Sequence, residues 1–310
     1  MAANMAEIAS VSLTRPLGEF SRELGQSFKE FGFAIVRDHG IPAELIARAE
    51  EVSRAFFALP EAVKLRYRMP GQGGARGYTP FRAERAKGAA AHDLKEFWHV
   101  GRDLPPGDPF ETFMPPNVWP AEVPEFRPTI AALFAAFDEA GLRILQAIAL
   151  YLGLERDFFA PTVEKGNSVL RLLHYPPVPR AAEGAVRAAA HEDINAITLL
   201  LGAEEAGLEL LSKDGRWLPV SPPPGALAVN IGDMLQRLTA HRLRSTTHRV
   251  INPAGEAARR SRYSMPFFLH FRPDFMIEPL ESCVGAGDSP PPPITAHDFL
   301  QQRLREIGLA

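Results

Sequence analysis

The sequence predicts an α+β fold class with a mainly β core and flanking helices. Two observations favour this architecture. Between about residues 166 and 271, short apolar runs alternate with turn signals such as Asp214-Gly215, a pattern typical of a sandwich, barrel or jelly roll. On both sides of this region, apolar residues recur at steps of three and four, as they do along one face of a helix. A parallel sheet is disfavoured, because its strands would alternate with helices.

Composition and charge exclude several classes of protein. With 46% hydrophobic and 23% charged residues among 310, the chain as a whole is neither disordered nor fibrous. The formal net charge of −3 gives no basic field for nucleic acid or an anionic membrane. No stretch approaches the roughly 18 apolar residues of a membrane span, and no signal peptide is visible. The single cysteine, Cys283, fits a reducing compartment, so we expect a cytoplasmic protein of unknown oligomeric state.

The first third of the chain predicts a helix, a strand and a second helix. The first helix has an apolar stripe, made of Leu17, Phe20, Leu24, Phe28 and Phe31. Residues 33–36 form a short apolar run that ends at a turn. Pro42 suits the first turn of the second helix, which stops near Pro60. We expect these elements to form an extension in front of the β core.

The same patterns define the later elements. Residues 70–120 are rich in turn signals, and a long helix is predicted over 129–152, with Gly153 at the position after the helix that favours glycine. A proline run at 290–293 leads to a last helix that carries Phe299, Leu300 and Leu304. Strands are predicted at Val169–Tyr175, Ile197–Leu201, Leu208–Leu211, Leu227–Ile231, 249–251 and 262–271.

Three residues of the β region have the types and spacing of a metal site. In an extended segment, His191 and Asp193 lie on one face, and His248 follows 55 residues later. Two imidazoles and a carboxylate at adjacent corners of an octahedron are the ligands of non-haem Fe(II) oxygenases, and they leave three positions open. His191 and Asp193 alone do not identify a metal site, since the pattern His-x-Asp also occurs by chance.

A second group stands at the start of the last long strand. Arg262 and Ser264 lie on one face of this strand. A guanidinium with a hydroxyl beside it can hold a carboxylate by charge-assisted hydrogen bonds. The alternative is a salt bridge at the rim of the fold. The position of Arg262, 14 residues beyond His248, favours a binding role.

Four stretches of the chain together resemble the isopenicillin N synthase-like family of 2-oxoglutarate- and Fe(II)-dependent dioxygenases. They are Phe31-Gly32-Phe33-Ala34-Ile35-Val36 with His39-Gly40-Ile41-Pro42, Leu172-Leu173-His174-Tyr175-Pro176-Pro177, His191-x-Asp193 with Asn230-Ile231-Gly232-Asp233-Met234-Leu235, and His248-Arg249-Val250-Ile251-Asn252-Pro253 followed by Arg262-x-Ser264. Each stretch by itself gives only weak support for the resemblance. Their order and spacing, over nearly the whole chain, make the resemblance specific.

The resemblance implies a double-stranded β-helix, or jelly roll, in one compact unit. Its regions are an N-terminal region (1–120), a long supporting helix (121–165), the Fe(II)/2-oxoglutarate core (166–275) and a C-terminal segment with a helix (276–310). It also implies that His191, Asp193 and His248 bind Fe(II), and that Arg262 and Ser264, with Tyr175, bind 2-oxoglutarate.

The activity that the resemblance implies is the O₂-dependent oxidation of a small molecule, by default a hydroxylation, with release of succinate and CO₂. Three alternatives stay open. Some relatives keep the arginine–serine pair yet work as oxidases without 2-oxoglutarate. A non-catalytic jelly-roll module that binds metal or a small ligand is disfavoured, because all three metal ligands are present. A zinc hydrolase is disfavoured because no general base stands at motif spacing.

The chain departs from the family pattern in three places. Many relatives carry asparagine two residues before the tyrosine, where this chain has Leu173, so part of the co-substrate contact is expected to differ. The segment before Arg262 is a few residues longer than is common, and it brings in Arg259 and Arg260 as competing cations. Neither has a serine two positions on. His241 stands where an asparagine–glycine turn is usual, and the sequence offers no physical reason for it.

The substrate is not identified by the sequence, but three residues are candidates for its pocket. Strand alternation puts Arg171 on the face of Tyr175, where it would meet an acidic substrate. Phe97 and His99 share a face in the same way and would line the substrate side. The alternative for Arg171 is an internal ion pair, with Asp93, Glu84 or Glu96 as partner, because an unpaired buried cation is costly.

Overall fold

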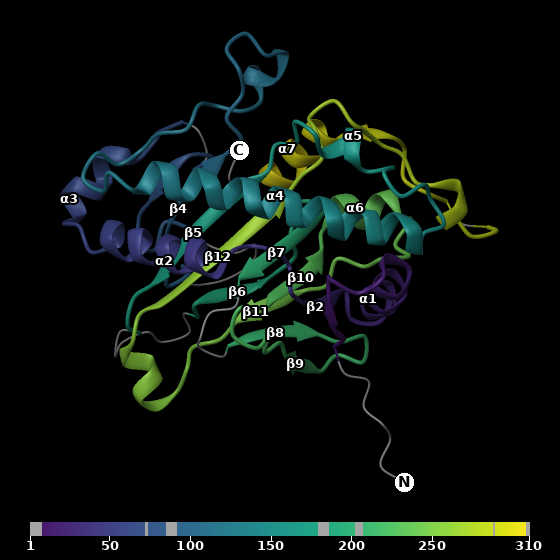
Figure 1. The fold of residues 1–310 in the computed structure, drawn as a ribbon, viewed down its shortest axis with the longest axis horizontal. Coiled ribbons are helices and arrows are strands. Elements are labelled where there is room, and N and C mark those ends of the chain that lie inside the picture. The colour runs from purple at the N-terminus through teal and green to yellow at the C-terminus, as the bar shows by residue number, and fades with distance from the viewer. Residues whose placement is uncertain are drawn as a thin grey trace.

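The computed structural model describes residues 8–71, 74–84, 92–178, 186–201, 207–287 and 289–307. In this part of the chain, two mainly antiparallel sheets form the core, and helices pack outside them (Figure 1). No helix among the described residues has both the length and the apolar composition needed to cross a membrane.

The larger sheet joins strands from the N-terminal extension to strands of the core. Its order is β1 (Ser10–Ser12), β2 (Phe33–Arg37), β10 (Leu227–Ile231), β7 (Ile197–Leu201), β12 (Arg262–Leu269), β5 (Val169–Tyr175), β4 (Glu96–Gly101) and β3 (Gly77–Thr79). Of these described strands, only the β1–β2 pair is parallel. The extension is therefore part of the same sheet and not a separate domain.

The smaller sheet has the order β6 (Ala188–His191), β11 (His248–Val250), β8 (Leu208–Leu211) and β9 (Trp217–Pro219). A short pair, β13 (Met276–Ile277) and β14 (Ile294–Thr295), leads to the last helix. Because β6 and β11 are neighbours, segments far apart in the sequence meet at one edge of this sheet.

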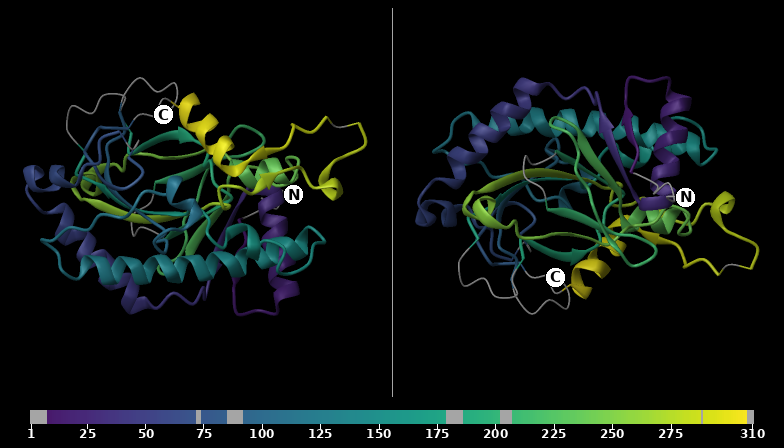
Figure 2. Two further views of the ribbon diagram at one scale, coloured as in Figure 1. Left: turned by 90° about the horizontal axis from the view of Figure 1, so that it is seen from above. Right: turned by 90° about the horizontal axis from the view of Figure 1, so that it is seen from below.

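Long helices cover the outer face of the larger sheet, with the 26-residue α4 along its length (Figures 1 and 2). The helices are α1 (Leu17–Phe31), α2 (Ala43–Phe57), α3 (Glu61–Lys64), α4 (Phe126–Tyr151), α5 (Ala160–Val163), α6 (Asp233–Leu238) and α7 (Ala296–Glu306). Single 3₁₀ turns occur at Leu65–Tyr67, Pro109–Thr112, Gly255–Arg259 and Glu281–Cys283. The last helix, α7, lies on the opposite side of the strands from α4 (Figure 2).

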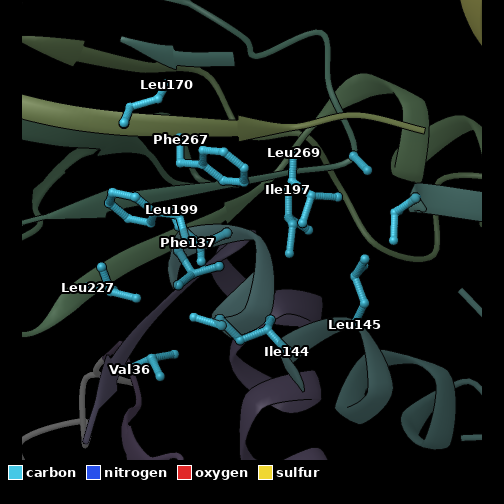
Figure 3. Packing of buried hydrophobic residues seen from close by; sticks show 14 of the residues in the cluster. Val36, Phe137, Ile144, Leu145, Leu170, Ile197, Leu199, Leu227, Phe267 and Leu269 are labelled. Atoms are coloured by element: carbon cyan, nitrogen blue, oxygen red, sulfur yellow. The ribbon is translucent and has the colours of Figure 1, made fainter. Parts of the chain in front are cut away.

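The layer between α4 and the sheet is tightly packed (Figure 3). The ring of Phe137 stacks on that of Phe267 with centroids 5.3 Å apart. A Cβ atom on Gly141 would lie 2.4 Å from Leu269 Cδ1, so only glycine lets the helix approach this closely. Close packing of this layer fixes the position of the large sheet. The sheet face that points away from α4 is therefore held in place as well.

Most predicted elements are confirmed. The first helix, the strands at β5, β7, β8 and β10, and the glycine after α4, with φ of 77° at Gly153, agree with the sequence analysis. The long helix begins three residues earlier than predicted, and β11 begins at His248 rather than at 249. The strands β1, β3, β4, β6 and β9 were not predicted as such.

The turn after α6 holds two consecutive non-glycine residues in the left-handed region. Ala240 has φ of 45° and His241 has φ of 64°. This is the place where the resemblance expects asparagine and glycine, the residues that adopt positive φ at least cost. At His241, where the sequence departs from the family pattern, the chain therefore forms a strained turn.

Replacing His241 by glycine is expected to stabilise the protein by about 0.5–1 kcal/mol, because relief of left-handed strain exceeds the added entropy of the unfolded chain. Urea unfolding measures the difference. Arg242→Gly, at the next position, where φ is not positive, is the control and should destabilise. A free energy of unfolding that is lower for His241→Gly than for the wild type would show that this turn is not strained.

Candidate active site

The structure brings the three sequence-predicted metal ligands together. His191 ends β6, Asp193 follows two residues later, and His248 begins β11 directly opposite His191. The Nε2 atoms of both histidines lie 3.8 Å from Asp193 Oδ1. One ligand atom from each residue falls within 4.8 Å of the others, so the three form one possible site for a metal ion.

Backbone carbonyls set the tautomer of both imidazoles. His191 Nδ1 lies 2.8 Å from the Ala189 carbonyl oxygen, and His248 Nδ1 lies 3.0 Å from that of Thr246. Because a carbonyl only accepts, each Nδ1 carries the proton and donates it. Each Nε2 therefore presents a lone pair to the shared space, as a metal ligand must.

The two oxygens of Asp193 have different environments. Oδ2 accepts hydrogen bonds from Thr198 Oγ1 at 2.6 Å and Asn230 Nδ2 at 2.7 Å, and Oδ1 faces the two imidazoles. Burial raises the pKa of this carboxyl, but the two histidines and the two hydrogen bonds outweigh it and lower the pKa. Asp193 is thus an anion with one oxygen directed at the site.

The turn that carries Asp193 is held by the junction between β10 and α6. The Asp233 amide donates to the Asp193 carbonyl at 2.7 Å, and the Gly232 amide donates to Ala196 at 2.9 Å. A Cβ on Gly232 would lie 2.1 Å from the Asn195 carbonyl oxygen. This contact explains why glycine stands in the stretch 230–235 that contributed to the family resemblance.

The donor set fits Fe(II). Two imidazole nitrogens and one carboxylate oxygen, all on one side of a common point, are the protein ligands of non-haem iron oxygenases. Among the described residues, no other group of histidine, cysteine and acidic side chains has this arrangement. His191 keeps 40% of its side chain exposed, so the site opens on one side.

The open side faces a cavity of about 820 Å³. Its wall includes β4 and β5 of the large sheet, the end of β6, and the helix α7, through Leu300 and Leu304. Arg303 of α7 pairs with Asp233 of α6 at 2.8 Å. This ion pair ties the helix that covers the cavity to the element that supports Asp193.

The three residues expected to bind 2-oxoglutarate lie on neighbouring strands. Arg262 is directly opposite Tyr175, with its guanidinium carbon 5.1 Å from the tyrosine ring centroid. Ser264 is on the same face of β12, and Arg262 and Ser264 are both buried. By contrast, the competing Arg259 and Arg260 are exposed.

The three substrate candidates also lie together, and Arg171 has internal partners. Its Nε donates to His99 Nε2 at 2.6 Å, and its guanidinium pairs with Glu84 at 3.4 Å. His99 Nδ1 lies 2.6 Å from the Gly74 carbonyl oxygen, so His99 is neutral with its proton on Nδ1. The Arg171 guanidinium also lies over the Phe97 ring, at 4.2 Å.

Charges around Arg171 are balanced. Lys95 pairs with Glu84 at 3.1 Å and with Asp93 at 2.8 Å. Burial raises the pKa of Glu84, but Arg171 and Lys95 outweigh it and lower the pKa to about 2. The carboxylates of Asp93 and Glu84 therefore neutralise the cations of Lys95 and Arg171. An internal ion pair was the alternative role that the sequence left open for Arg171.

Sequence reasoning missed the residues that hold Asp193. Asn230 was quoted only as part of the family resemblance, and Thr198 gave no signal beyond its place in an apolar strand. Their role depends on the register between β10 and β7, where Asn230 lies opposite Thr198.

The sequence is similar to family models and to known proteins over most of its length. Residues 8–122 match the family described as non-haem dioxygenase in morphine synthesis, N-terminal, and residues 166–271 match the 2OG-Fe(II) oxygenase superfamily. The 2-oxoglutarate-Fe(II) type oxidoreductase hxnY of Emericella nidulans is 36% identical over 92% of this chain and 84% of its own. Validamycin A dioxygenase of Streptomyces hygroscopicus is 33% identical over 89% of this chain and 78% of its own.

Solved structures extend the likeness to the fold. A 2OG-Fe(II) oxygenase family protein from Caulobacter crescentus superposes with a TM-score of 0.91 at 55% identity, over 97% of this chain and 99% of its own. A full-length protein from Neurospora crassa, solved in complex with alpha-KG and thymine, superposes with a TM-score of 0.86 at 28% identity, over 96% of both chains.

Gly232→Ala is expected to weaken Mn(II) binding by about 10–100-fold, the usual effect of disturbing groups that orient a metal ligand. The new methyl group would displace the Asn195 carbonyl and with it the turn that carries Asp193. Gly18→Ala in α1, where a Cβ has no neighbour within 4 Å, is the matched control. Equal Mn(II) affinity in both variants, measured by calorimetry, would contradict the role of this contact.

Proposed function

The chain belongs to the 2OG-Fe(II) oxygenase superfamily, and from this premise we propose which of its residues carry the activity. It is an enzyme that uses Fe(II), 2-oxoglutarate and O₂ to oxidise a small molecule. The predicted oxygenase class and jelly-roll core are thereby confirmed. The proposal concerns the metal ligands, the co-substrate site and the substrate wall.

His191, Asp193 and His248 hold the iron. The observation that supports this assignment is the convergence of two imidazole Nε2 atoms on Asp193 Oδ1, while the other polar atom of each side chain is hydrogen-bonded elsewhere. When bound, iron supplies the redox chemistry that couples O₂ and the decarboxylation of 2-oxoglutarate to oxidation of the substrate. These three side chains would supply the protein's ligands to the ion, and the cavity that His191 and Asp193 line would leave room for the co-substrate and O₂.

Arg262, Ser264 and Tyr175 hold the distal carboxylate of 2-oxoglutarate. Arg262 is 4% exposed and Ser264 is 5% exposed, so their hydrogen bonds form out of water, where they are stronger. Tyr175 lies opposite Arg262 and adds a third donor. The exposed Arg259 and Arg260 have no part in this site.

Phe97, His99 and Arg171 form the substrate wall. The ion pair with Glu84 and the hydrogen bond to His99 fix the Arg171 side chain, so this wall acts by shape and polarity rather than through a free charge. The cavity volume of about 820 Å³ suits a small molecule, the kind of ligand bound in the Neurospora crassa complex with thymine. The single cysteine continues to favour a cytoplasmic location.

His191→Ala and Asp193→Ala are each expected to fold normally and lose iron, because each removes a metal ligand and little packing. Anaerobic titration with Fe(II) and 2-oxoglutarate, followed by the weak visible charge-transfer band, measures the loss. Circular dichroism confirms folding. Stoichiometric iron in either variant at micromolar metal would overturn the assignment.

Arg262→Ala is expected to weaken 2-oxoglutarate binding while iron still binds. Loss of one partner in a desolvated charge pair costs about 2–5 kcal/mol, or roughly 30-fold or more in dissociation constant. Arg259→Ala is the matched control, since its side chain is exposed. A strong effect of Arg259→Ala and none of Arg262→Ala would show that the co-substrate uses a different arginine.

A further inference from the structure

His270 is a histidine in the wall of the cavity that contains the metal ligands. It directly follows β12, and 8% of its surface is exposed. The preceding Leu269 carbonyl accepts the Ala196 amide at 2.9 Å, so His270 stands beside the turn that carries Asp193. It lies eight residues beyond Arg262, roughly 26 Å along an extended chain. His270 is therefore close to the metal ligands and far from the group proposed to hold the distal carboxylate of 2-oxoglutarate.

The imidazole of His270 offers a hydrogen-bond acceptor to the cavity. Nδ1 lies 3.0 Å from the Phe268 carbonyl oxygen, so Nδ1 carries the proton and Nε2 carries a lone pair. Burial lowers the pKa of His270 to about 4, against the opposing effects of this carbonyl and of Asp193, so the ring is neutral at neutral pH. Nε2 has no partner among the described residues. It is also not one of the unpaired side-chain atoms that are fully covered, so it is open to the cavity.

Asn167 is a second uncharged polar side chain at this place. Val169 pairs with Phe268, and the same register continued by two residues puts Asn167 opposite His270 on one face. The Asn167 amide donates to the Phe271 carbonyl at 3.4 Å, so the two segments stay side by side. Asn167 is half-buried and lines the cavity, and its side-chain amide has no hydrogen-bond partner within the described structure and is not fully covered. Opposite side chains of this kind have Cβ atoms about 5 Å apart.

The neighbouring polar groups of the same wall are already occupied. His99 Nε2 accepts from Arg171 at 2.6 Å, and the charges of Arg171 and Lys95 are balanced by those of Glu84 and Asp93. His270 and Asn167 differ from them, because they present an acceptor and an amide that nothing in the described structure uses. Polar groups at buried positions are normally paired in native proteins, so a ligand with complementary groups fits here.

We propose that His270 and Asn167 bind an uncharged amide edge of the primary substrate, an N–H group beside a carbonyl oxygen, as in a lactam. This inference rests on the proposed function, because it places the substrate in the cavity that contains the metal ligands. His270 Nε2 accepts the substrate N–H, and the Asn167 side-chain amide donates to the carbonyl oxygen. A site built in this way rejects an analogue that lacks the N–H, because the acceptor is then left unpaired.

The test compares 2-pyrrolidinone, a small lactam, with N-methyl-2-pyrrolidinone, which lacks the N–H. Mn(II) takes the place of iron, and 2-oxoglutarate is kept at saturation, so that each compound is titrated without turnover. Because Mn(II) is paramagnetic, it broadens the NMR signals of a molecule bound in the cavity. The wild type is expected to bind the lactam about 10-fold more tightly than the N-methyl compound, the usual effect of leaving one buried acceptor unpaired.

Three variants assign this preference to its residues. His270→Phe keeps a ring but removes Nε2, and it should bind the two compounds equally. His270→Gln, which keeps an acceptor oxygen, should retain part of the preference. Asn167→Leu should weaken both compounds alike, since both keep the carbonyl. His297→Phe is the matched control, because His297 lines the same cavity from α7, and it should keep the full preference.

Two results overturn the inference. One is equal affinity of the wild type for the two compounds, which needs no variant and so does not depend on how a substitution folds. The other is a preference that survives unchanged in His270→Phe, with circular dichroism showing that this variant is folded.

The charge-transfer band separates this inference from the proposed function. If the wild type forms no band with Fe(II) and 2-oxoglutarate, the proposed function fails. If the band forms but the wild type binds the two compounds equally, only the amide site fails. In a screen by succinate release, substrates with an amide N–H should be preferred to their N-methyl analogues, and this preference should fall by about 10-fold in His270→Phe.

Discussion

The two carboxylate oxygens of Asp193 have different partners, and this difference is the constraint on which the rest of the site depends. Thr198 and Asn230 hold Oδ2, and Oδ1 is thereby turned towards His191 and His248. Both supporting residues lie on strands of the large sheet, in register with each other, and the sheet is packed against α4. The metal ligand is therefore positioned by the core of the fold before any ion binds, which lowers the reorganisation that binding requires.

A second network joins the substrate wall to the metal ligands. Asp93 pairs with Lys95 and also accepts the Ala189 amide at 3.1 Å, and the Ala189 carbonyl in turn holds His191. The balanced charges of this wall thus serve to fix β6 as well as to shape the cavity.

Sequence patterns predicted the strands whose buried side chains are apolar. They did not predict the strands whose buried side chains are polar. The strands β5 and β12 were predicted because their apolar residues form continuous runs. The strand β4 was assumed only for the alternation of Phe97 with His99, since its apolar run is broken by Glu96 and His99. The burial of these two residues depends on Lys64, His174 and Arg171 from other elements. The metal ligands were predicted from spacing and residue type.

A crystal structure of the complex with Mn(II) and 2-oxoglutarate, grown without oxygen, tests the central claim most directly. The account predicts one metal ion bound by Nε2 of His191, Nε2 of His248 and Oδ1 of Asp193. It also predicts that Asp193 Oδ2 keeps its hydrogen bonds to Thr198 and Asn230. A metal ion at another place, or an Asp193 carboxylate that binds through both oxygens and releases these two partners, would contradict it.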